Sequence, residues 1–159
     1  MINLIQDYMI TPVVRFINII VVALLAGVSF GIWIGFNPSV LSASAFIEQQ
    51  QNMLHSLRSL LVSLVVTATL ITFLSAYMHK NSRPAFFSLL IAAILLIACI
   101  LITRFGNKPI DDLVITWTID TIPVNWTEFR DKWWSFHILR TIAEILALFL
   151  ITWTSINKK

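Results

Sequence analysis

A row of aromatic, basic and acidic residues precedes and enters the last apolar stretch of the sequence. At successive steps of four, three, four, three and four residues, its members are Trp126, Arg130, Trp133, His137, Arg140 and Glu144. This spacing predicts one helical face, because residues three or four apart are neighbours on a helix. Imidazoles exchange protons near neutral pH, guanidinium groups stabilise developing negative charge, and indoles stack on flat rings. The row therefore indicates a site for acid–base chemistry or for binding an aromatic molecule.

A second polar row lies at the start of an earlier apolar stretch. At steps of four, three and four residues, its members are Glu48, Asn52, His55 and Ser59. If the helices alternate in direction, the two rows begin at the same end of a bundle. We therefore expect His55, His137 and Arg140, together with Asn107 from the segment after the third apolar stretch, to line one cavity at that end.

The elements that position these rows are expected to be membrane helices. Of the 159 residues, 58% are hydrophobic and 12% are charged, and the mean hydropathy is +0.85, which leaves too little polar surface for a soluble globule. A membrane helix needs ~20 mostly apolar residues. Four continuous stretches qualify, at residues 16–36, 57–78, 85–103 and 138–156. The sequence predicts an all-α integral membrane four-helix bundle that forms one domain, residues 1–159.

The fourth helix is expected to extend beyond its membrane span. If it runs from Trp126 to Ile156, its polar row is about 27 Å long, and Glu144 lies about two turns inside the membrane. An ionised carboxylate is costly there unless it is paired. We therefore expect Glu144 to face the bundle interior, with Arg140 as its partner.

Charged residues in the connections suggest an orientation. Lys80 and Arg83 lie in the short connection between the second and third stretches, which the positive-inside rule places in the cytoplasm. An even number of spans then places both termini there. The net charge of +3 gives no support for a nucleic-acid partner. The expected surroundings are membrane lipid, and a homo-oligomer is compatible with the sequence.

A simpler interpretation assigns the polar residues to anchoring at the membrane interface. Arginine, histidine and tryptophan are common there, since their side chains reach the headgroup region. Anchors need no shared helical face, however, and Glu144 lies deeper than an interface. The two rows together therefore favour a functional site.

Two motifs in the second half of the chain resemble a known family. Gly106-Asn107-Lys108-Pro109-Ile110-Asp111 follows the third stretch, and Trp126-x3-Arg130-x2-Trp133-x3-His137-x2-Arg140-Thr141 enters the fourth. Together with the helix count and the pattern Ala26-Gly27-x2-Phe30-Gly31, they resemble the anthrone-oxygenase-like family of small four-helix membrane proteins, which is largely of unknown function. That family typically carries asparagine where this chain has Asp111. The resemblance implies oxidation of a planar, hydrophobic, anthrone-like molecule with dioxygen and without a cofactor.

The resemblance and the residue chemistry together suggest roles. An anthrone has a C–H bond whose anion is delocalised over three rings, so a base and an electrostatic stabiliser would let it react with dioxygen. His55 or His137 is the candidate base, and Arg140 is the candidate stabiliser, with Arg58 or Arg104 beside it. The other candidate substrate-binding residues are Asn107, Asp111, Trp126, Arg130, Trp133, Trp134 and Glu144.

Two alternative functions stay open on the sequence. In one, His55 and His137 with Glu48 or Glu144 bind iron or copper, or the two histidines hold a haem. In the other, the protein is not an enzyme, and its polar end binds a lipid, a quinone or a partner subunit.

Overall fold

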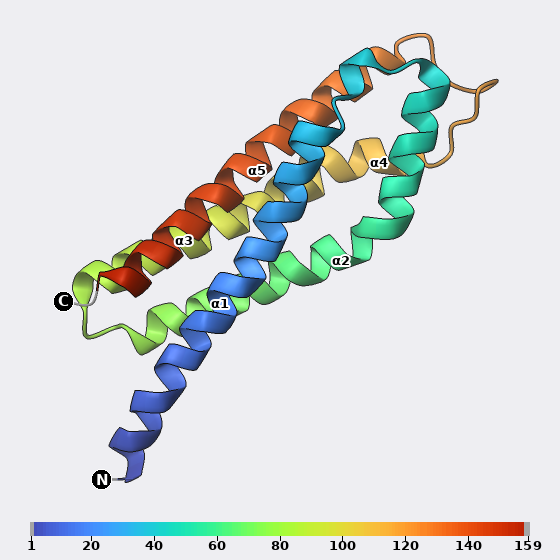
Figure 1. Cartoon of the computed structure of the whole chain (residues 1–159). Coiled ribbons are helices and arrows are strands. Elements are labelled where there is room, and N and C mark those ends of the chain that lie inside the picture. Colours follow the sequence, from blue (N-terminus) through green and yellow to red (C-terminus); the bar gives the residue numbers. More distant parts are fainter. Residues whose placement is uncertain (1, 158–159) are drawn as a thin grey trace.

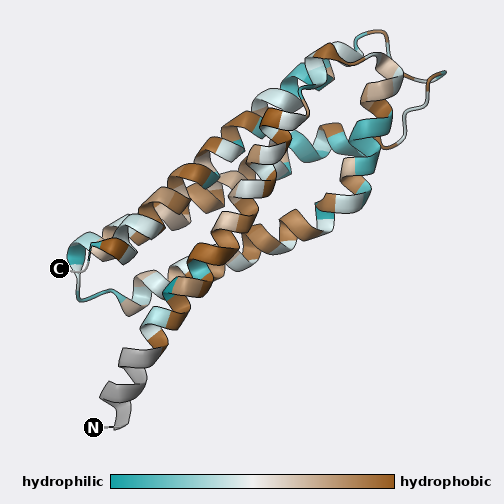
Figure 2. Cartoon of the chain, in the orientation of Figure 1, coloured by the Kyte–Doolittle hydropathy of each residue, from teal (hydrophilic) through white to brown (hydrophobic). Residues whose placement is uncertain are grey.

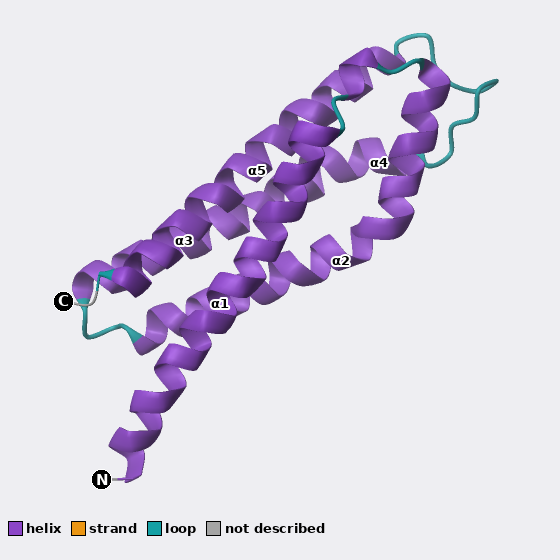
Figure 3. Ribbon diagram, in the orientation of Figure 1, coloured by secondary structure: helices purple, strands orange, loops and turns teal. Residues whose placement is uncertain are grey.

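The computed structural model describes residues 2–157, with side chains from residue 10 onward. Its four long helices are α1 (Ile2–Gly35), α2 (Ala43–Met78), α3 (Arg83–Ile102) and α5 (Trp126–Ile156). Three short helices, η1 (Pro38–Val40), η2 (Thr103–Asn107) and α4 (Lys108–Val114), lie in or beside the connections (Figure 1). The described part of the chain contains no strand (Figure 3). The predicted all-α class is confirmed.

The long helices form an antiparallel bundle in which α2 and α5 lie on a diagonal. α1 packs against α2 and α5, and α3 packs against the same two helices from the other side. Where the helices are closest, the core is built from small and branched side chains, among them Val22, Ala68, Leu96 and Ala147. Small residues let membrane helices approach one another closely. The bundle is therefore tightly packed in the half that contains the α2–α3 connection.

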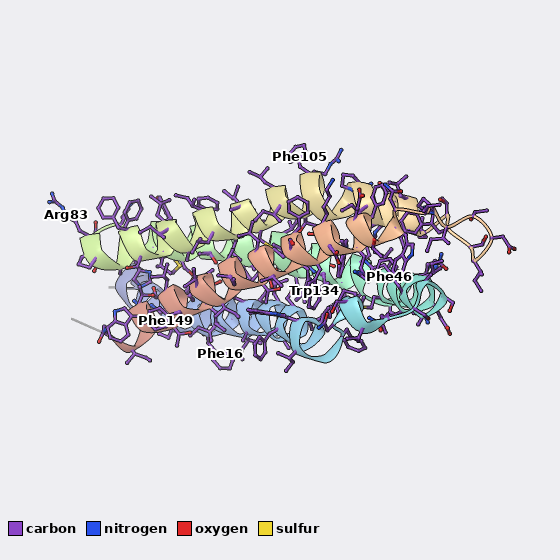
Figure 4. All side chains as sticks on the ribbon, turned by 90° about the horizontal axis from the view of Figure 1, so that it is seen from above. Phe16, Phe46, Arg83, Phe105, Trp134 and Phe149 are labelled. Atoms are coloured by element: carbon purple, nitrogen blue, oxygen red, sulfur yellow. The ribbon has the colours of Figure 1, made fainter. Side chains whose placement is uncertain are left out.

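The outer surface of the bundle is apolar along the helices. All four helices are long and apolar enough to cross a membrane, and each predicted span lies within one of them or extends one residue past its end. Phe16, Phe105 and Phe149 project outward from the bundle (Figure 4) and are exposed. Hydrophilic residues gather toward the ends of the helices, most densely around α4 and the facing part of α2 (Figure 2). The predicted membrane bundle is confirmed, and lipid is the medium that accounts for the exposed apolar residues.

The third span continues past its predicted end through a π-helical segment. The Lys108 N–H bonds to the Thr103 carbonyl, which is the wider i to i+5 pattern of a π-helix. Pro109 follows within the first turn of α4, where its missing N–H is tolerated. The segment buries Gly106 and Asn107 against α5. Single-turn π-helices are frequent at functional sites because they displace side chains from the regular helical register.

The fourth span is one uninterrupted helix from Trp126 to Ile156, as predicted. It starts well before the predicted membrane boundary at residue 138. Its row of polar residues therefore runs from the loop end of the bundle into the apolar core.

Candidate functional site

A cavity of about 340 Å³ lies between α2 and the segment formed by α3, η2 and α4, and Trp133 and Arg140 of α5 also line it. Its α2 wall is mostly apolar and includes Leu57, Leu61 and Val65. Val62 and Val66, which also line it, are 50% and 44% exposed on the outer surface. The cavity is therefore bordered by the lipid-facing surface of α2. Its volume falls in the range of ~300–1,000 Å³ that is usual for small-molecule sites.

A buried carboxylate marks the polar part of the cavity. Asp111 in α4 lines it and is 8% exposed. The Asp111 Oδ1 accepts hydrogen bonds from the Trp133 Nε1–H at 2.8 Å and from the Gln50 side-chain amide at 3.2 Å. Helices α2, α4 and α5 thus meet at one carboxylate oxygen.

The π-helical segment adds an amide to the same cavity. The Asn107 side-chain N–H donates to the Trp133 carbonyl at 3.0 Å. The Asn107 Oδ1 and the Arg140 Nε are buried and have no hydrogen-bond partner among the described residues. Buried polar atoms nearly always have a partner, so these two atoms point to a ligand or water in this region.

Arg140 connects the cavity with a buried polar network. It lines the cavity, and its Nη2 donates to the His137 Nδ1 at 3.1 Å. Since a guanidinium only donates, the His137 Nδ1 must accept, and the Nε2–H then donates to the Ser29 carbonyl at 3.1 Å. His137 is therefore a neutral imidazole with both nitrogen atoms engaged. It is fully buried and stacks on Trp133, with ring centroids 5.2 Å apart.

Glu144 lies behind Arg140, one helical turn deeper. It is fully buried, its Oε1 is 3.9 Å from the Arg140 Nη1, and the same oxygen accepts a hydrogen bond from the Cys99 thiol at 3.0 Å. The prediction that Glu144 faces the bundle interior beside a basic partner is confirmed. Cys99 lines the cavity, so this acid is separated from the cavity by one side chain.

Some of the residues predicted to share a cavity line it in the structure, and others do not. Arg140 and Asn107 line it, as do Asp111, Trp133, Arg58 and Arg104. The prediction is wrong for both imidazoles: His55 is exposed on α2 and lies outside the cavity lining, and His137 is buried behind Arg140. The whole row from Glu48 to Ser59 is on the outer surface of α2. Near a helix end, a polar row loses little by facing outward, which explains the difference.

Other candidate residues have structural contacts outside the cavity. Trp126 packs against Phe46 with ring centroids 5.5 Å apart, and the Arg130 guanidinium lies 5.1 Å from the Trp126 ring. Arg130 also pairs with Asp131 at 2.8 Å. Trp134 stacks on His137 at 5.5 Å and does not line the cavity.

The four residues of the alternative metal site are not brought together. Glu48 and His55 are exposed on α2, whereas His137 and Glu144 are buried on α5. Among the described residues, no group of three or more His, Cys, Asp or Glu is arranged to hold a metal ion.

Sequence reasoning missed two side chains of this region. Gln50 is buried and bonds to Asp111, although it lies in a polar run between the exposed Glu48 and Asn52. Cys99, the single cysteine of the chain, is buried and donates to Glu144. The available signal for Gln50 was its spacing of three, four and seven residues from Met53, Leu54 and Leu57, which share its helical face.

An apolar bundle of four helices long enough to cross a membrane, with a partly polar cavity inside it, defines a small multi-pass membrane protein. The sequence profile of the family described as Anthrone oxygenase matches residues 51–150, which is 100 of the 159 residues. The chain belongs to this family. Comparisons with curated proteins and with solved structures found no match.

Proposed function

We propose that the protein is a membrane oxygenase that oxidises a planar, anthrone-like aromatic molecule with dioxygen and without a cofactor, in the cavity between α2 and the α3–η2–α4 segment. The observation that carries the proposal is the position of Arg140, a buried cation on the wall of an otherwise mostly apolar cavity. The family match supports the same reaction class. A hydrophobic substrate dissolved in the membrane would enter beside Val62 and Val66.

The proposed role of Arg140 is electrostatic. Loss of a proton from the central methylene of an anthrone leaves negative charge on the carbonyl oxygen of the enolate. A guanidinium that is already desolvated stabilises such a charge more strongly than water does, because little reorganisation is needed. Glu144 and His137 hold the guanidinium in place from behind.

The reaction balances with dioxygen as the oxidant. The methylene C–H proton passes to water, and the enolate gives one electron to dioxygen. The resulting radical and superoxide combine to form a C–O bond, and the peroxide anion takes back the proton that was released to water. The hydroperoxide then loses water as its O–O bond breaks and the second C–H proton leaves. One dioxygen thus converts the methylene to a carbonyl and yields one water. His55 and His137 are unsuitable as the base in this scheme, since the first lies outside the cavity and the second has both nitrogen atoms engaged.

A matched pair of substitutions on α2 tests the location of the reaction. Leu61 lines the cavity, whereas its neighbour Leu60 is 47% exposed on the outer surface. We expect Leu61→Trp to fill the cavity and abolish oxidation of an anthrone by the protein in lipid vesicles, while Leu60→Trp keeps the wild-type rate. Equal rates in the two variants would contradict the location.

The absence of a cofactor needs its own measurement. Elemental analysis and an absorption spectrum of the active preparation are expected to show no stoichiometric iron, copper or haem. A stoichiometric metal whose removal stops the reaction would overturn this part of the proposal and would favour the metal alternative.

A further inference from the structure

We propose that Asp111 selects ligands that carry a hydrogen-bond donor, such as a phenolic hydroxyl group, because the Oδ2 of its carboxylate is a fixed acceptor on the cavity wall. The planar aromatic class of the ligand rests on the proposed function. The selection by Asp111 rests on its own contacts.

The carboxylate is held in one orientation by two donors. The Trp133 indole and the Gln50 amide both donate to Oδ1, at 2.8 and 3.2 Å. Trp133 and Gln50 are themselves buried, and they come from different helices. Rotation of the carboxylate would break both bonds, so Oδ1 and Oδ2 keep distinct positions.

The second oxygen is left for a ligand. The Asp111 Oδ2 accepts no hydrogen bond from the described residues, and it is not among their fully enclosed unpartnered atoms. Because Asp111 lines the cavity, we infer that its Oδ2 faces the cavity. An ionised carboxylate oxygen only accepts hydrogen bonds. A ligand with a hydrogen-bond donor at this position gains a charge-assisted hydrogen bond to Oδ2. An ether oxygen at the same position is an acceptor that faces another acceptor, so no hydrogen bond forms and both oxygens lose their contact with water.

Asparagine at this position would reverse the polarity. The amide oxygen of Asn would remain beneath the two N–H donors, because an amide nitrogen cannot accept from them. Its NH₂ group would then face the cavity, where Asp111 presents an acceptor. The substitution Asp111→Asn therefore exchanges an acceptor for a donor with almost no change in shape.

Binding without oxygen tests the inference separately from catalysis. The protein in lipid vesicles is titrated anaerobically with a dihydroxyanthrone and with the dimethyl ether of the same compound. We expect the wild type to prefer the hydroxylated probe by about tenfold or more. Asp111→Asn should lose this preference, because its NH₂ group can donate to a hydroxyl oxygen and to an ether oxygen alike. The matched control is Asp112→Asn, since Asp112 is exposed, pairs with Arg58 and Lys108, and lies outside the cavity lining. It should keep the wild-type preference.

A second variant covers the case in which Asp111→Asn fails to fold. Trp133→Phe removes one of the two donors to Oδ1, and we expect it to reduce the preference for the hydroxylated probe. Equal affinity of the wild type for both probes would overturn the inference, and so would an unchanged preference in Asp111→Asn. If Asp111→Asn binds both probes like the wild type but no longer oxidises them, Asp111 is a base, and the selection role is wrong. A wild type that shows the preference but never oxidises either probe contradicts the proposed function alone.

Discussion

The buried pair of Arg140 and Glu144 is the residue-scale feature that most constrains the interior of the bundle. Both side chains are away from water, and the Glu144 carboxylate also accepts from Cys99. Removing one partner of a buried ion pair typically costs about 3–5 kcal/mol, because the other charge is left uncompensated. The pair therefore makes folding depend on the side chain that the proposed reaction uses.

Glu144→Gln is expected to lower the midpoint of thermal unfolding in detergent strongly, with a loss of folded yield. The shape of the side chain is kept, so the loss reports the charge opposite Arg140. Glu128→Gln is the control, since Glu128 is exposed in the first turn of the same helix and should change little. Equal unfolding midpoints for the two variants would show that Glu144 is only packed.

His79, just beyond the end of α2, gives a residue-scale expectation for pH. Its Nδ1 lies 2.7 Å from the Ser75 carbonyl, and its Nε2 contacts the Arg15 guanidinium. Burial is the main cause that lowers the pKa of His79. The bond to Ser75 raises this pKa, and the Arg15 charge lowers it further. The unfolded chain, with a histidine pKa of about 6.5, thus binds the proton more readily than the folded protein.

Stability from His79 is therefore complete above about pH 6.5 and is lost as the pH falls below that value. We expect thermal unfolding of the wild type to shift to lower temperature on acidification, and His79→Gln to reduce the slope. His55→Gln, at an exposed position on α2, is the control substitution. A wild type whose stability rises on acidification through this range would contradict the assignment.

At the scale of elements, the contact between η2 and α5 positions Asn107 and Trp133, which line the cavity. Gly106 in η2 faces α5 so closely that a Cβ atom would lie 2.7 Å from the Phe136 ring. The absence of a side chain at this position lets the π-helical turn approach α5, which places Asn107 beside Trp133.

Gly106→Ala is expected to destabilise the protein by about 1–3 kcal/mol, the usual cost of overpacking. Gly31→Ala is the matched control, because nothing lies within 4 Å of its added Cβ. The midpoint of thermal unfolding measures both effects. Combining Gly106→Ala with Phe136→Leu should recover part of the loss, and no difference between the two single variants would argue against the close contact.

The two polar rows show what helical spacing can and cannot predict. Each row does share one helical face, but the α5 row faces inward and the α2 row faces outward. In α5 the row enters the apolar region, where a lipid-facing Glu144 would be too costly. In α2 the row stays near the loop end, where either direction is tolerated. Spacing alone therefore predicted that the residues of each row share one face of their helix. Whether that face points into the bundle or outward depended on how deep the residues lie in the membrane.

Other parts of the site depend on contacts that the sequence does not contain. The four spans and the long fourth helix were predictable from the lengths of the apolar stretches. The lining of the cavity was predictable only in part, for Arg140 and Asn107, because the rest depends on how the π-helical segment η2 and α4 pack opposite α2. The contact between Gln50 and Asp111 joins positions 61 residues apart, which local periodicity cannot reveal.

At the scale of the whole molecule, one end of the bundle is tightly packed and the other holds the cavity. α1 begins and α5 ends at the same end as the α2–α3 connection (Figure 1). The cytoplasmic location of that end stays a prediction from Lys80 and Arg83. If it is correct, the cavity lies in the half of the membrane away from the cytoplasm.

The most direct test of the proposed reaction is the rate at which the purified protein in lipid vesicles forms the quinone from an anthrone and dioxygen, measured for the wild type and for Arg140→Gln. Arg130→Gln serves as the control on the same helix, since Arg130 pairs with Asp131 outside the cavity. We expect the wild type and the control to exceed the rate in protein-free vesicles, and folded Arg140→Gln to be slower by about 10²–10³. A wild type no faster than protein-free vesicles, or an Arg140→Gln variant as fast as the wild type, would contradict the proposal.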